Sequence, residues 1–201
     1  MLCKIKQSSR TATVNPLRGF TVAELVVVCG IIGILSLVIM AGYRTYSSQS
    51  LLQSLMYEMA VSVREAQVFG SAVKSQSSSF DVDYGVKFST QDDGSQYVIL
   101  SRPVGSSATT PVNTFTITRS NQITGLYSCP VGWADISACT PQTDIYLYFK
   151  RPHFDTDMES AATVSGPVVV DTTSDAFVIV VTGPTGTREL HLYRSGRVAI
   201  R

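Results

Sequence analysis

An uninterrupted apolar run near the start of the chain constrains this protein more than any other feature of its sequence. Residues 20–43 are 24 residues long and contain a single charged side chain, that of Glu24. As an α-helix they would extend roughly 36 Å, more than the ~30 Å hydrocarbon core of a bilayer, so the segment can span a membrane. Glu24 then needs an explanation, because an ionised group near the bilayer centre costs about 2.5 to 3.5 kcal/mol and usually has a partner.

Three interpretations of Glu24 compete. In the first, Thr21 caps the helix and the Glu24 carboxylate reaches back to the Thr21 backbone N–H, which is a capping box. In the second, the carboxylate lies at the edge of the membrane, at the level of the headgroups. In the third, the chain is cut between Gly19 and Phe20, and Glu24 pairs with the new α-ammonium group of a neighbouring copy. We favour the third because it explains most features together, and it is compatible with a capping box.

The residues Gly19, Phe20, Thr21 and Glu24 stand directly before the long apolar helix. This arrangement resembles the processing site of type IV prepilins and of the pseudopilins of type II secretion. The resemblance implies that a membrane aspartyl peptidase, the prepilin peptidase, cuts after Gly19. It also implies that Phe20 becomes an N-methylated first residue and that Glu24, at the fifth mature position, acts in assembly.

The first 19 residues are basic. They contain Lys4, Lys6, Arg10 and Arg18 and no acidic residue, although the whole chain has a net charge of only +1. A cationic leader before an apolar helix stays in the cytoplasm, which places the residues after 43 outside. A cleavable secretory signal is the alternative, but its apolar run would be shorter and its cut would fall near residues 41–42. The remainder is mildly acidic, so bulk charge gives no case for nucleic-acid binding.

The four cysteines divide between the leader, the apolar helix and the exported part. Cys3 and Cys29 belong to the first two, and Cys129 and Cys139 to the third. An extracytoplasmic location permits oxidation, and a bridge closing this short loop would stabilise the fold by roughly 3 kcal/mol in the chain-entropy model. We therefore expect a Cys129–Cys139 disulfide, with two free buried thiols as the alternative.

Beyond residue 43 the helical pattern continues in an amphipathic form. Apolar residues recur at steps of three, four or seven, and charged residues fall largely between them; the apolar positions are Leu52, Leu55, Met56, Met59, Val63, Ala66 and Val73. This periodicity predicts one helix over about residues 21–74, whose second half lies on another part of the fold.

After the polar residues 75–79 the pattern alternates with a period of two, which is typical of strands. The predicted strands cover residues 80–88, 97–100, 114–118, 145–150, 168–170, 177–182, 189–193 and 198–200, and the first two form a hairpin across Asp92, Asp93 and Gly94. Residues 103–112 are expected to be an exposed loop. The predicted class is α+β, with the long helix packed on an antiparallel sheet. This plan is similar to that of the minor pseudopilins with an all-β globular part.

The acidic stretch around Asp155, Asp157 and Glu159, with His153, places alternate oxygens in an expected loop. Such a loop can suit calcium, but the spacing of an EF-hand is missing, so a solvated turn is favoured and no cofactor is expected. For catalysis the sequence offers two histidines and no spacing that marks a nucleophile or general base. His191 is expected to be structural. Trp133 is expected to belong to the core, with an exposed contact residue as the alternative.

Together these features predict a structural subunit and not an enzyme. Its expected parts are a cleaved leader (1–19), a helix (20–74, with 20–43 in the membrane) and an extracytoplasmic β-rich domain (75–201). The expected partners are the prepilin peptidase, other pilin or pseudopilin subunits, the inner-membrane assembly platform and, before assembly, membrane lipid. The expected location is the inner membrane and then a surface or periplasmic filament. The alternative is a monomeric, membrane-anchored extracytoplasmic binding domain.

Overall fold

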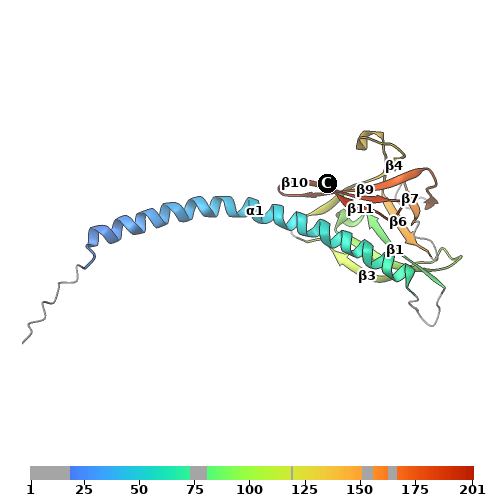
Figure 1. Ribbon diagram of the computed structural model, residues 1–201, viewed down its shortest axis with the longest axis horizontal. Coiled ribbons are helices and arrows are strands. Elements are labelled where there is room, and N and C mark those ends of the chain that lie inside the picture. Colours follow the sequence, from blue (N-terminus) through green and yellow to red (C-terminus); the bar gives the residue numbers. More distant parts are fainter. Residues whose placement is uncertain (1–18, 73–80, 119, 151–155, 163–166) are drawn as a thin grey trace, which may run out of the picture. The chain divides into compact units, whose positions relative to one another are not determined.

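A computed structural model describes residues 19–72, 81–118, 120–150, 156–162 and 167–201 of the chain (Figure 1). Its contacts divide the chain into two compact units, residues 1–43 and 44–201, which we describe separately. The first contains the beginning of the long helix α1 (Val22–Ser71), and the second contains the rest of α1 and all the strands. Some residues to which the sequence assigns a helix, a strand or a loop lie outside the described part: Val73, Lys74, Phe80, His153 and Asp155.

The second part of α1 is amphipathic, as its periodicity predicts. Leu52, Met56, Met59, Val63 and Ala66 are all buried and belong to a single hydrophobic core. Their spacing places them on one stripe of the helix, and that stripe lies on the strands of the same unit (Figure 1).

Eleven described strands form two sheets in which every pairing is antiparallel. The larger sheet has the order β3-β2-β1-β6-β7-β8 and the smaller one β11-β10-β9-β4-β5. The bounds are β1 (Val82–Ser89), β2 (Gln96–Pro103), β3 (Thr110–Thr116), β4 (Gln122–Pro130), β5 (Thr140–Gln142), β6 (Asp144–Phe149), β7 (Thr156–Ala161), β8 (Val169–Val170), β9 (Ser174–Gly183), β10 (Gly186–Tyr193) and β11 (Val198–Ile200). Two short 3₁₀ turns, η1 (Asp92–Gly94) and η2 (Ile136–Ala138), complete the elements. The α+β class is confirmed, with two sheets where the sequence suggested one.

The hairpin between β1 and β2 turns at η1, where the sequence predicts it. Asp93 and Gly94 both have positive φ angles, of 58° and 60°. A Cβ at Gly94 would lie 2.1 Å from the carbonyl oxygen of Ile123 in β4, so only glycine fits there. The turn of one sheet is therefore packed directly against the backbone of the other.

One core holds the second unit together. It joins the buried stripe of α1 to the inner faces of both sheets, for example through Phe88 and Leu147 of the larger sheet and Phe177 and Ile179 of the smaller one. The side chains that alternate with these point to the outer faces of the sheets. These outer faces carry most of the polar clusters described below.

The sequence misses three strands, β4, β5 and β7, and places part of a fourth in a loop. The sequence predicts a loop over residues 103–112, but β3 begins at Thr110. Most side chains of β3 are exposed, so no alternation of apolar residues marks it. It is held by backbone pairing with β2 and by Phe115, whose ring stacks on that of Tyr97 with centroids 4.8 Å apart.

Candidate functional site

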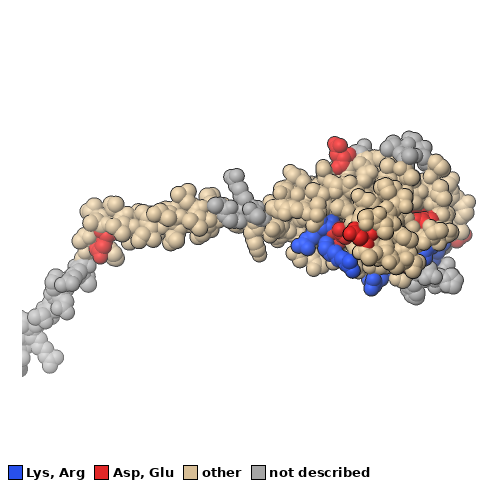
Figure 2. Space-filling model, turned by 90° about the horizontal axis from the view of Figure 1, so that it is seen from above, with Lys and Arg blue, Asp and Glu red and all other residues tan. Residues whose placement is uncertain are grey.

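The helix segment Val22–Met40 is the most unusual surface of the described chain. This segment of 19 residues is long enough and apolar enough to cross a membrane, and none of its residues is buried. Phe20, directly before it, has 83% of its surface exposed. Figure 2 shows this end of the helix almost free of charged groups, whereas Lys, Arg, Asp and Glu gather on the unit of residues 44–201. A single apolar helix of this kind is compatible with a single-pass membrane anchor, and a signal sequence has the same length and composition.

Glu24 forms the capping box that its spacing from Thr21 predicts. Oε2 of Glu24 accepts hydrogen bonds from the backbone N and from Oγ1 of Thr21, both at 3.2 Å. The Glu24 backbone N donates in return to Oγ1 of Thr21, also at 3.2 Å. Among the described residues, Oε1 of Glu24 has no hydrogen-bond partner. The cap thus uses one carboxylate oxygen and leaves the other for a further cation or donor.

The remaining polar and small residues of this segment suit an apolar environment. The Ser36 hydroxyl donates to the carbonyl oxygen of Ile32 at 2.7 Å, so it needs no water. Gly19, Gly30 and Gly33 have no neighbouring atom within 4 Å of the place where a Cβ would stand. The glycines of the helix leave room for another helix to approach closely, and Gly19 leaves room around the peptide bond that precedes Phe20.

A second, smaller apolar row lies on the exposed side of α1 within residues 44–201. Tyr57, Val61 and Val68 are all more than half exposed, and they recur at helical spacing. Tyr57 and Val61 border a groove of about 400 Å³ that is lined also by Arg64 of α1 and by Val198 and Ile200 of the edge strand β11. This side of the helix faces away from the core and presents a surface that another molecule can contact.

Cys129 and Cys139 are joined in a disulfide, with their Cα atoms 4.4 Å apart. Asp135 caps η2 within the loop that they close. The ring of Trp133, from the same loop, lies against His191, with centroids 5.2 Å apart. Trp133 is partly exposed, so the expectation that it belongs to the core is wrong: the loop lays it on the outer face of the smaller sheet.

The two described acidic residues considered for calcium are each paired with a basic side chain. Asp157 and Glu159 lie in strand β7 and not in a loop, which corrects the expected local structure. Asp157 forms an ion pair with Lys150, and Glu159 accepts two hydrogen bonds from Arg102. The third candidate, Asp155, lies outside the described residues. Within the described ranges, no group of three or more His, Cys, Asp or Glu side chains is placed to hold a metal ion.

His191 is buried in the outer face of the smaller sheet, beneath Trp133. Its Nε2 lies 2.8 Å from Oε2 of Glu189, two residues away on the same strand. The side chain is 1% exposed, and the residues around it form no nucleophile and base arrangement among the described atoms. Its position is that of a packed strand residue.

The chain matches no protein-family model, no curated protein and no solved structure.

Proposed function

We propose that this protein is a structural subunit of a helical filament of the type IV pilus or secretion pseudopilus kind. The observation that carries the proposal is the unburied apolar segment Val22–Met40, headed by Gly19, Phe20 and the capped Glu24. In this proposal the prepilin peptidase cuts after Gly19, Phe20 is N-methylated, and the helix first lies in the inner membrane. It then packs among the helices of other subunits, on an assembly platform in that membrane.

The physical problem of such assembly is to take an apolar helix with one carboxylate from lipid into protein. Lateral packing against other helices replaces the lipid contacts of the apolar side chains. The carboxylate of Glu24 would oppose the transfer if it were unpaired, because a buried charge without a partner is strongly destabilising. The free oxygen Oε1 of Glu24 suits the α-ammonium group of Phe20 in a neighbouring subunit, while Oε2 keeps the helix cap.

The exposed row of Tyr57, Val61 and Val68 supports a second area of contact between subunits, outside the lipid. Such contacts need no cofactor and no catalytic group, and the proposal includes neither. The exported unit carries the disulfide, which fits a location outside the cytoplasm.

The experiment is to measure the intact mass of the protein from cells that express it with its peptidase. The expected product lacks residues 1–19 and carries one additional methyl group. Gly19→Val should accumulate as the uncut precursor, because a peptidase pocket that admits only hydrogen rejects a Cβ branch. Gly33→Val is the matched control, and it should be cut like the wild type.

If the protein keeps Met1 and has no methyl group, or if Gly19→Val is cut at the same site and rate, the filament proposal fails. The anchored binding domain then becomes the better explanation, because an anchor has no need to lose residues 1–19.

A further inference from the structure

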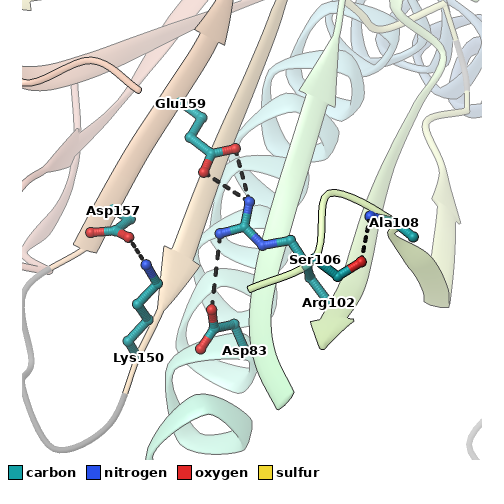
Figure 3. Close-up of polar contacts among 7 residues, drawn as sticks. All are labelled: Asp83, Arg102, Ser106, Ala108, Lys150, Asp157 and Glu159. Atoms are coloured by element: carbon teal, nitrogen blue, oxygen red, sulfur yellow. Dashed lines mark hydrogen bonds and ion pairs between the residues drawn. The ribbon is translucent and has the colours of Figure 1, made fainter. Parts of the chain in front are cut away.

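A cleft lies on the outer face of the larger sheet, away from α1 and from the proposed assembly segment. Its volume is about 500 Å³, within the range of sites for small ligands. Its walls are the β2–β3 connection, with Ser106 and Ser107, and the region of β8, with Val170. Arg102, Glu159 and two tyrosines from β6 also line it. Figure 3 shows the charged groups of this face.

Arg102 is held rigidly in this cleft. Its Nη1 donates to both carboxylate oxygens of Glu159, at 2.8 and 3.1 Å. Its Nη2 lies 3.9 Å from Oδ2 of Asp83, and its guanidinium carbon lies 3.6 Å from the ring centroid of Tyr148. Figure 3 shows the guanidinium between the two carboxylates. A group fixed on three sides loses little further entropy when it binds a ligand.

A glycine in β1 leaves the space that the rings and the guanidinium group of this cleft occupy. Gly85 of β1 lies opposite Tyr148 of β6 in the sheet. A Cβ at Gly85 would stand 2.7 Å from Cδ1 of Tyr148, so any other residue would displace the ring on which Arg102 stacks. With no side chain in the way, Arg102 of β2 extends across the sheet to Glu159 of β7.

The charged groups of the cleft are buried and paired with one another. Glu159 and Asp83 are 8% and 5% exposed, and Tyr148 is 1% exposed. Burial raises the pKa of the Tyr148 hydroxyl to about 12, so it remains a neutral donor. Arg102 and Glu159 are the charged residues among those lining the cleft, and they form an ion pair. The wall therefore offers strong polar groups without a net charge.

Hydrogen-bonding capacity remains on both partners. Among the described residues, Arg102 donates hydrogen bonds from Nη1 only, although a guanidinium has five N–H groups. Each Glu159 oxygen accepts one hydrogen bond there and can accept more. A hydroxyl group both accepts and donates, so two neighbouring hydroxyls can accept from Arg102 and donate to Glu159 at once. Tyr146, whose ring is nearly parallel to that of Tyr148, adds an aromatic surface.

We propose that this cleft binds an uncharged saccharide through the fixed Arg102–Glu159 pair. A saccharide has neighbouring hydroxyls for the ion pair and apolar C–H groups for Tyr146 and Val170. Neither an anionic nor a cationic ligand gains a net attraction from the lining, because the charges of Arg102 and Glu159 compensate each other. The inference is independent of the filament proposal, because it concerns only the outer face of the larger sheet.

The test uses the full chain in a detergent without a sugar headgroup. The probes are the neutral disaccharides maltose, cellobiose, lactose and mannobiose, with glucuronate and glucosamine as charged comparisons. Binding is measured by saturation-transfer NMR and calorimetry at sugar concentrations up to about 10 mM, which detects affinities in the millimolar range.

Two substitutions locate the binding. Ser107→Trp places a large side chain in the cleft from an exposed loop position and should weaken binding at least about tenfold. Ser137→Trp makes the same change at an exposed position of η2 and should leave the affinity unchanged. Arg102→Lys keeps the positive charge beside Glu159 but loses the planar fork, and it should also weaken binding about tenfold or more. Circular dichroism checks that each variant is folded.

Binding of at least one neutral disaccharide, lost in Ser107→Trp and kept in Ser137→Trp, supports the proposal. Three results overturn it: no neutral probe binds, the charged sugars bind more tightly than the neutral ones, or a folded Ser107→Trp binds as well as the wild type.

Discussion

The two parts of helix α1 have the same backbone conformation and opposite surroundings. Val22–Met40 has no buried residue, whereas five side chains of the later part lie in the core. The polar groups of the first part bond within the helix, as Ser36 does to Ile32. Those of the second part also bond outside the helix, as Gln67 does to the carbonyl oxygen of Gly196, in the turn between β10 and β11, at 2.7 Å. The second part is thus built into this fold, whereas the apolar side chains of the first part are exposed.

The comparison predicts that truncating a side chain harms the fold only in the second part of α1, and only on one side. Met59 is fully buried, so Met59→Ala should lower the free energy of unfolding by about 2 to 5 kcal/mol through lost contacts and a cavity. Val61→Ala, two residues away and 66% exposed, should change it by less than about 0.5 kcal/mol. Urea unfolding followed by circular dichroism measures both. Equal losses of unfolding free energy in the two variants would contradict the assignment of a buried and an exposed side to this part of the helix.

The second prediction concerns the cysteines of the two units. Replacing Cys129 and Cys139 together by serine should cost about 3 kcal/mol, because the unfolded chain gains entropy when the loop opens. Trp133 is the single tryptophan, so its fluorescence should change as the loop leaves His191. Cys29→Ser, in the exposed apolar segment, is the matched control and should alter neither signal. If the double variant is as stable as the wild type, the disulfide does not stabilise the fold.

The third prediction is a pH dependence confined to the unit of residues 44–201. Burial acts to raise the pKa of Asp171, but hydrogen bonds from Ser128, Ser174 and Thr173 outweigh it and lower this pKa from 3.8 to about 2. The folded state therefore favours the ionised carboxylate, whose contribution is complete above pH 3.8 and is lost as the pH falls towards 2.

Asp171→Asn should accordingly destabilise the protein at pH 7 by about 1 kcal/mol, since charge-assisted hydrogen bonds are replaced by weaker ones. The difference from the wild type should shrink as the pH falls from 3.8 to about 2. Unfolding midpoints at several pH values measure it, with Asp175→Asn as the neighbouring control. A difference that stays constant over this range would exclude a role for the Asp171 charge.

The smallest effect on folding is expected at the beginning of α1. Glu24→Gln keeps part of the cap to Thr21, so it should cost at most about 1 kcal/mol locally and leave the melting of the second unit unchanged. If Glu24 pairs with an ammonium group of another subunit, the variant is cut and folded but stays in the membrane. The measurement is the ratio of subunit in sheared filaments to subunit in membranes, in cells without a wild-type copy. An unchanged ratio would leave Glu24 with the capping role alone.

The sequence predicted the elements whose signals are local. The stripe of α1, the β1–β2 hairpin and the β10–β11 ending each combine a clear period with turn residues such as Gly94 and Gly196, and the structure has them near the expected positions. It missed β4, because Gly125 and Pro130 break the pattern of that strand. It also took the acidic side chains of β7 for loop residues, because Glu159 pairs with Arg102, which is distant in the sequence.

The sequence by itself determined the properties of the first, apolar part of helix α1. The length of its apolar run, its one carboxylate and its cap depend on residues no more than a few positions apart, so the sequence displays them directly. Only the tertiary structure decided which side chains meet on the outer faces of the sheets. Trp133 reaches His191, and Arg102 reaches Glu159, through the register of strands far apart in the chain. Contacts between residues so far apart in the chain depend on how the strands come together in the sheets, which no short stretch of the sequence displays.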